Sequence, residues 1–144
     1  MKKLTMMFAV FASTFSACGG ETTLFVGTVT RTITAPGGRP YKVEDTGHTA
    51  MAYTAPNYVT VSGLDNDALI FDRNRDQLAL DTTSTDTTYT SPSFDEKCDF
   101  TAGTGILSGT TLSVDATETC EGEDHKLGEK TVLTINIHFT GYTR

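Results

Sequence analysis

The sequence predicts an all-β domain, either a small antiparallel β-barrel or a β-sandwich whose strands follow one another as a meander. Threonine, with 26 copies from residue 18 onward, alternates repeatedly with apolar residues, which is a composition typical of strands. Short segments of this kind recur at intervals of roughly 8–12 residues, separated by turn signals. No segment of the domain shows a convincing helical period.

The strands can be placed along the chain by this alternation. The first covers residues 24–35, where Phe25, Val29 and Ile33 share a side with Arg31, the only charged residue on it. A turn rich in proline and glycine follows at residues 35–38. Further short strands are expected at 49–54, 58–62, 68–72 and 77–80, and the most regular one at 131–140. The threonine-rich stretch 81–93 is either an exposed edge strand or a flexible connector.

Two cysteines flank a predicted hairpin. If Ser108-Gly109-Thr110 forms a three-residue loop, paired positions follow directly from it: Leu107 with Thr111, Ile106 with Leu112, and Cys98 with Cys120. Directly opposed residues have Cα atoms about 4.5–5.5 Å apart, which is within the range of a disulfide. We therefore expect a Cys98–Cys120 disulfide, although Gly103 and Gly105 invite a bulge that would shift the register by one residue.

The N-terminus has the layout of a secretory signal peptide. Lys2 and Lys3 precede an uncharged, mainly apolar stretch at 4–15, and small residues follow it. The stretch is shorter than the about 20 apolar residues that a spanning helix needs. Residues 1–17 are therefore expected to be a signal peptide that is removed from the mature chain.

The residues Phe15-Ser16-Ala17-Cys18 resemble the lipobox of bacterial lipoproteins. The resemblance implies cleavage between Ala17 and Cys18, a diacylglyceryl group on the Cys18 sulfur, and an acyl chain such as palmitate on the new amine. Phe15 departs from the family, in which leucine is usual. Gly19 resembles the residue that directs lipoproteins of Gram-negative bacteria to the outer membrane, so this membrane is expected in preference to the inner one.

A lipid on Cys18 would explain the odd number of cysteines. Three cysteines in an exported chain leave one without a partner, and lipidation of Cys18 leaves Cys98 and Cys120 as a pair in an oxidising compartment. Each buried methylene contributes about 0.8 kcal/mol, so two or three chains would hold the protein at the membrane. Residues 18–23 would then be a short flexible tether and 24–144 a single domain, held within roughly 20 Å of the headgroups.

The net charge of the chain restricts the classes of molecule that it can bind. The net charge of −7 becomes −9 when the two lysines of the signal peptide are removed and the new amine is acylated. Such a domain is repelled by nucleic acid and by anionic headgroups. We therefore expect no nucleic-acid partner.

Catalytic and metal-binding patterns are scarce, and we expect no catalytic residue, no metal and no cofactor. No G-x-S-x-G motif occurs, and His48, His125 and His138 lack metal-ligand spacing. Residues 72–76 supply oxygen ligands at three alternate positions as a calcium loop does, but Gln77 replaces the required glycine. A charged hairpin turn is the preferred interpretation there.

Two non-enzymatic functions remain. The first is a structural or interaction module that presents an acidic face to an envelope protein. The second is a carrier of a small apolar ligand, because Gly27-Thr28-Val29 resembles the glycine motif of lipocalins, although Val29 stands where that family has tryptophan. A large apolar internal cavity would favour the carrier, and an interior filled by side chains would favour the interaction module.

The anchor can be tested by substitution. Cys18→Ser should prevent lipidation and leave an uncleaved or soluble periplasmic form, because no thiol remains to accept the diacylglyceryl group. Detergent phase partitioning measures this, with the wild-type protein in the detergent phase as the control. An unchanged detergent-phase fraction for the variant would refute the lipid anchor.

Overall fold

The computed structural model describes residues 19–83 and 86–144, and these residues form nine strands. The expected signal peptide with Ala17, and the expected lipid site Cys18, lie outside the described residues. The strands are β1 (Glu21–Thr34), β2 (Tyr41–Thr54), β3 (Tyr58–Ser62), β4 (Leu69–Asn74), β5 (Gln77–Leu80), β6 (Asp86–Thr90), β7 (Phe94–Ser108), β8 (Thr111–Asp124) and β9 (Glu129–Thr143). Within the same two ranges, no helix has the length and apolar character needed to cross a membrane.

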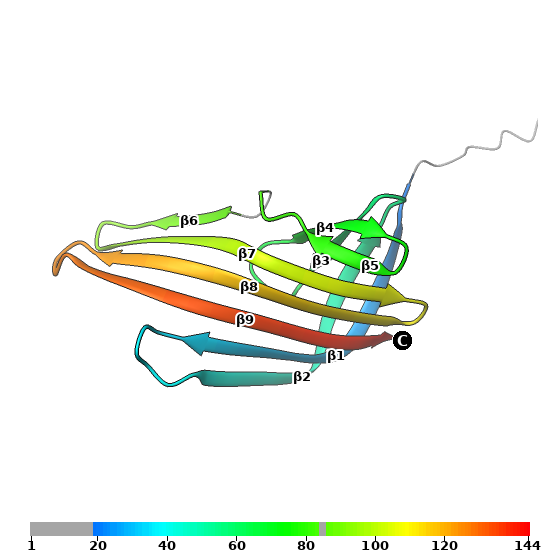
Figure 1. The fold of residues 1–144 in the computed structure, drawn as a ribbon, viewed down its shortest axis with the longest axis horizontal. Helices are drawn as coiled ribbons and strands as arrows, with labels where there is room; N and C mark the ends of the chain where they lie inside the picture. The colour runs from blue at the N-terminus through cyan, green and yellow to red at the C-terminus, as the bar shows by residue number, and fades with distance from the viewer. Residues whose placement is uncertain (1–18, 84–85) are drawn as a thin grey trace, which may run out of the picture.

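All nine strands belong to one antiparallel sheet, in the order β5-β4-β3-β2-β1-β9-β8-β7-β6. This order confirms the predicted all-β, meander-like fold. The strands form one sheet, and not the two stacked sheets of a sandwich. β7 has two partners on the same side, because residues 104–106 pair with β5 and residues 95–99 pair with β6. The β5–β7 pairing closes eight strands into a ring at one end of the molecule, while β6 extends the sheet at the other end (Figure 1).

The long strands β1 and β2 contribute to both the ring and the open part of the sheet, because their register shifts at a bulge. Gly27 pairs with His48 and Thr28 with Thr46, which leaves Gly47 unpaired. Gly47 has φ of 72°, a conformation that glycine adopts without strain. Gly27 lies so close to β9 that a Cβ atom there would stand 1.9 Å from the Thr140 carbonyl oxygen. Glycine at both positions therefore permits the bend that separates the ring from the open part of the sheet.

The hydrophobic core fills the ring. Its largest fully buried side chains are Phe25, Phe71, Phe139, Leu64, Leu69, Leu112 and Ile137. These residues come from several different strands and one loop, so side chains from distant parts of the chain occupy the ring interior. Burying one such side chain contributes about 1.5–3 kcal/mol. The core therefore holds the ring together, whereas the open part of the sheet carries mainly half-buried and exposed residues.

Several strands are longer than the alternation predicts. β1 begins at Glu21 and not at residue 24, so the second half of the expected tether belongs to the sheet. β2 extends back from the expected 49–54 to Tyr41, through residues whose exposed, charged side chains hide the strand pattern. The threonine-rich stretch contains the edge strand β6, the first of the two alternatives.

The β7–β8 hairpin reaches the expected cysteine pairing by a different path. Its loop has two residues, Gly109 and Thr110, so that Leu107 pairs with Leu112 and Ile106 with Ser113. The predicted pairs of Leu107 and Ile106 are therefore wrong by one residue. A bulge between Phe100 and Ala102 then shifts the register back.

The shifted register places Cys98 opposite Cys120. The Cα atoms of the pair are 4.0 Å apart, and the sulfur atoms lie 2.13 Å apart, at disulfide distance. The short loop and the bulge thus compensate each other at this pair.

Loss of this cross-link should destabilise the protein. The two cysteines are separated by 22 residues in the sequence, and closing a loop of about that length stabilises by about 3 kcal/mol in the chain-entropy model. Reduction, or the double change Cys98→Ser with Cys120→Ser, should lower the melting temperature by several degrees. Circular dichroism melts with and without reductant measure this, and the double variant should not respond to reductant. Two free thiols in protein isolated from its native cells without reductant would contradict the disulfide.

Candidate functional site

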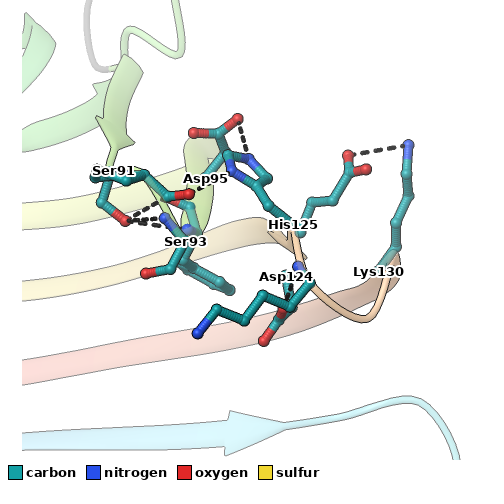
Figure 2. A network of polar contacts seen from close by, with 10 residues as sticks. Ser91, Ser93, Asp95, Asp124, His125 and Lys130 are labelled. Carbon is teal, nitrogen blue, oxygen red and sulfur yellow. Dashed lines mark hydrogen bonds and ion pairs between the residues drawn. The ribbon is translucent and has the colours of Figure 1, made fainter.

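The end of the sheet opposite the ring is organised by a network of polar contacts (Figure 2). We call this end the tip, and define it as residues 91–97 and 121–130. The His125 ring nitrogen Nε2 lies 2.8 Å from Asp95 Oδ2, and its Nδ1 lies 3.3 Å from the Pro92 carbonyl oxygen. The backbone N–H of His125 also donates to the Ser93 carbonyl, at 3.1 Å. His125 therefore ties the β8–β9 turn to the β6–β7 turn.

Each of these two turns is also stabilised by its own side chains. Ser91 Oγ accepts a hydrogen bond from the backbone N–H of Phe94 at 3.0 Å. Asp124 Oδ1 accepts hydrogen bonds from the backbone N–H groups of Lys126 and Leu127, at 2.8 and 3.1 Å. Short polar side chains that bind nearby backbone groups are typical turn formers. The tip is thus a defined surface and not a loose pair of loops.

The hydrogen bond with Asp95 raises the pKa of His125 above its ordinary value, and the bond with the Pro92 carbonyl acts in the same direction. The imidazolium form can donate from both ring nitrogens, which suits the two oxygen acceptors that it meets here. The link between the two turns is therefore strongest below the raised pKa of His125.

A pocket of about 450 Å³ lies at the tip, on the face directed away from the ring core. Its polar lining carries charges of both signs, from Asp95, Lys97, Glu121, Glu123 and Lys130, with Val132 and two threonines of β6 beside them. The tip as a whole carries six carboxylates and three lysines. The Lys130–Glu123 ion pair, at 3.5 Å, is largely exposed and contributes little to stability. These charges are consequently accessible to a partner.

A second acidic group lies on the inner face, where the ring opens into the free part of the sheet. Glu118 is only 4% exposed. Burial raises the pKa of Glu118 to about 7, and the charges of Asp65, Glu96 and Asp67 act in the same direction. Burial likewise raises the pKa of Asp65. Close to neutral pH, Glu118 is therefore half protonated, and its charge depends on small changes of pH.

The Arg31 side chain holds the loop between β3 and β4 over this inner face. Its Nη2 donates a hydrogen bond to the Leu64 carbonyl oxygen, and Leu64 itself is fully buried. The alternation of the first strand puts Arg31 on the apolar side, and the structure gives it a backbone carbonyl to bind there.

Two cavities lie beside the cysteine pair on the inner face of the open part of the sheet. One, of about 390 Å³, is lined by Asn66, Tyr89, Glu96 and Cys98. The other, of about 180 Å³, includes Phe94, Cys120 and Leu133. Glu96, Cys98 and Cys120 lie close enough together for metal ligation. At disulfide distance from each other, however, the two sulfurs are not available as thiolate ligands.

The other residues considered as ligands are dispersed. His138 is exposed on the polar face of β9, and its Nδ1 lies 2.6 Å from Asp115 Oδ1. His48 lies beside Asp45 at the bend of β2. The region of residues 72–76 forms the β4–β5 hairpin with a two-residue loop, Arg75 and Asp76, which confirms the predicted charged turn.

Sequence reasoning did not single out Glu118 or the Asp95–His125 link. Glu118 could have been found, because it occupies an apolar position in the alternation of Leu112, Val114, Ala116 and Cys120. The Asp95–His125 contact joins residues 30 apart in turns whose relative placement no local pattern fixes. Comparison with known proteins adds no family or relative, because no family model, curated protein or solved structure matches the chain.

The pKa of Glu118 predicts a pH dependence of stability. A carboxyl group whose pKa rises on folding, here from 4.5 to about 7, causes stability to fall as the pH rises between these two values. The loss is complete above about pH 7 and amounts to at most about 3 kcal/mol, and to less where water screens the charge. Glu118→Gln should remove this component, so that the variant is more stable than the wild type at pH 7.5 and similar to it at pH 4.5.

Urea unfolding of both proteins at both pH values measures the difference, in which the contribution of His125 cancels. Glu121→Gln, at an exposed position of the same strand, is the matched control and should leave the pH dependence unchanged. An equal pH dependence in wild type and Glu118→Gln would show that Glu118 is not the responsible group.

Proposed function

We propose that this protein is a lipid-anchored lipoprotein of the bacterial envelope, with the outer membrane as its site. Its β domain serves as a non-enzymatic interaction module. In this proposal Cys18 carries the lipid, and the acidic tip binds a basic segment of another envelope protein. The observation that carries the proposal is the charged outer pocket of the tip, at the end remote from the anchor.

The arrangement of the molecule supports this division of roles. The described chain begins at one end of the molecule, and the turns of the tip lie at the opposite end (Figure 1). β9 runs through 15 residues, and a strand rises about 3.3 Å per residue, so the tip is on the order of 45 Å from the ring end. A domain anchored at the ring end could thus present its tip well beyond its attachment point.

The chemistry of the pocket favours a basic partner. The carboxylates of Glu121 and Glu123 can accept paired hydrogen bonds from guanidinium groups. Lys97 and Lys130 on the neighbouring strands would repel a basic partner in the wrong register, so that specificity comes from the mixture of both signs of charge. Exposed Val132 offers a small apolar contact at the centre of such an interface.

The side chains that fill the ring interior also support an interaction module, because a carrier would need a large apolar cavity there. Phe25, Phe71 and Phe139 occupy the space that a lipocalin-like carrier would keep for its ligand. The carrier remains the second candidate because of the inner-face cavities beside Tyr89, Phe94 and Leu133, which could bind a small apolar molecule.

The interaction can be tested in the native envelope. A photoreactive amino acid at Val132 should cross-link to a protein partner, and the same group at Ile106, exposed near the ring end, should not. Changing Glu121 and Glu123 to Gln should reduce the cross-linked product by about twofold to thirtyfold, because two exposed ion pairs contribute about 0.2–1 kcal/mol each. Removing two charges elsewhere, with Asp72→Asn and Asp76→Asn, is the matched control.

A cross-link at Val132 that is insensitive to these charges would contradict an electrostatic partner. Absence of any cross-link, together with saturable binding of a fluorescent apolar probe that Leu133→Glu abolishes, would favour the carrier.

A further inference from the structure

Among the described residues, one outward surface of the ring end carries uncharged side chains alone. It is formed by the outward positions of residues 22–26, 49–53, 58–62 and 140–142 in four adjacent strands. Six of these positions are large, namely Leu24, Val26, Met51, Tyr53, Tyr58 and Tyr142, and the others are threonine or serine. We call this surface the uncharged face. It stands out in a chain with a net charge of −7.

The register shows that these side chains form one continuous patch. Leu24 lies opposite Met51 across β1 and β2, and Val26 lies opposite Tyr142 across β1 and β9. The rings of Tyr53 and Tyr58 are 6.1 Å apart. Leu24 is 53% exposed, Met51 43% and Tyr142 60%, although all three are apolar or aromatic. Contiguous exposed apolar surface of this kind marks an interaction site.

The start of the described chain is fixed directly on this face. The backbone N–H of Gly20 donates a hydrogen bond to the Tyr53 hydroxyl at 2.9 Å. A Cβ atom at Gly20 would stand 2.3 Å from the Thr54 carbonyl oxygen and 2.7 Å from the Tyr53 ring. Gly20 is therefore packed against β2 and does not provide the freedom of direction expected of a tether. Only Gly19 separates this packed residue from Cys18.

We propose that the uncharged face rests in the interfacial layer of the lipid bilayer that holds the protein. This inference depends on the proposed lipid at Cys18, since that lipid would begin two residues from Gly20, beside Tyr53. Tyrosine suits this layer, because its ring is apolar and its hydroxyl remains in contact with water. The face contributes apolar area from Leu24 and Met51 and leaves no charge to be desolvated.

The bilayer fits this face better than a second copy of the chain does. A lipid leaving the chain beside Tyr53 brings the membrane surface to the same side, where a second domain would have to displace it. The acidic tip lies at the other end of the molecule, so contact through the uncharged face does not press the tip carboxylates against anionic headgroups.

The absence of tryptophan from the sequence allows a direct test. The lipidated protein carrying Tyr142→Trp is reconstituted in phosphatidylcholine vesicles with and without brominated acyl chains, which quench indole fluorescence at short range. We expect a blue-shifted emission and strong quenching. Tyr41→Trp is the matched control, because Tyr41 is 67% exposed and lies at the far end of β2. Its fluorescence should not respond to bromine.

A further variant separates contact from mere proximity. Met51→Glu, combined with Tyr142→Trp, adds a charge to the face at an exposed position, and it should abolish the quenching while the protein stays in the detergent phase. Equal, weak quenching of both tryptophan variants in a protein that still partitions into detergent would overturn the inference and leave the anchor intact.

Failure to partition into detergent would instead refute the anchor and, with it, this inference. The last measurement uses the Cys18→Ser form carrying Tyr142→Trp and tests for self-association. Concentration-dependent dimers of that form, in which the introduced indole is shielded from water, would identify a second copy as the occupant and would also overturn the inference.

Discussion

The close contact between β1 and β9 at Gly27 is the constraint on which the rest of the structure depends. No side chain fits between Gly27 and the Thr140 carbonyl, and the opposite strand places the unpaired Gly47 at the same level. This bend allows a single sheet to close on itself at one end and to remain open at the other. Without it, β1 and β2 could not contribute both to the packed ring and to the extended part beside β9.

The two ends differ in what stabilises them. In the ring, buried phenylalanine, leucine and valine side chains supply the hydrophobic contribution. In the open part, the sheet depends on backbone pairing, the cross-link between β7 and β8, and the polar contacts of His125 and Asp95. Glu118 lies at the boundary, where a carboxyl group is covered by the ring but faces other acids. The boundary is thus the place where proton binding is coupled to the fold.

Alternation of apolar and polar residues predicted the fold class and the cores of most strands, because one side of each ring strand is buried. It did not predict the full length of β2, since residues 41–47 are exposed and carry no apolar period. The sequence predicts the cysteine pairing correctly although it predicts a β7–β8 loop that is one residue too long, because the bulge after Phe100 restores the register. Positions joined by turns, such as Asp95 and His125, could not be paired from the sequence. The lipid site at Cys18 remains a prediction.

The pairing of β1 with β9 also bears on how the chain reaches its native state. Phe25 pairs with Thr143, so one of the first strands to be synthesised cannot complete its pairing until the last strand is available. Folds dominated by such distant pairings reach the native state slowly, in milliseconds to seconds. During that interval Phe25 and Val29 would be uncovered. The chain would then need the β1–β2 hairpin, or a chaperone, to shield them until the C-terminal strand has formed.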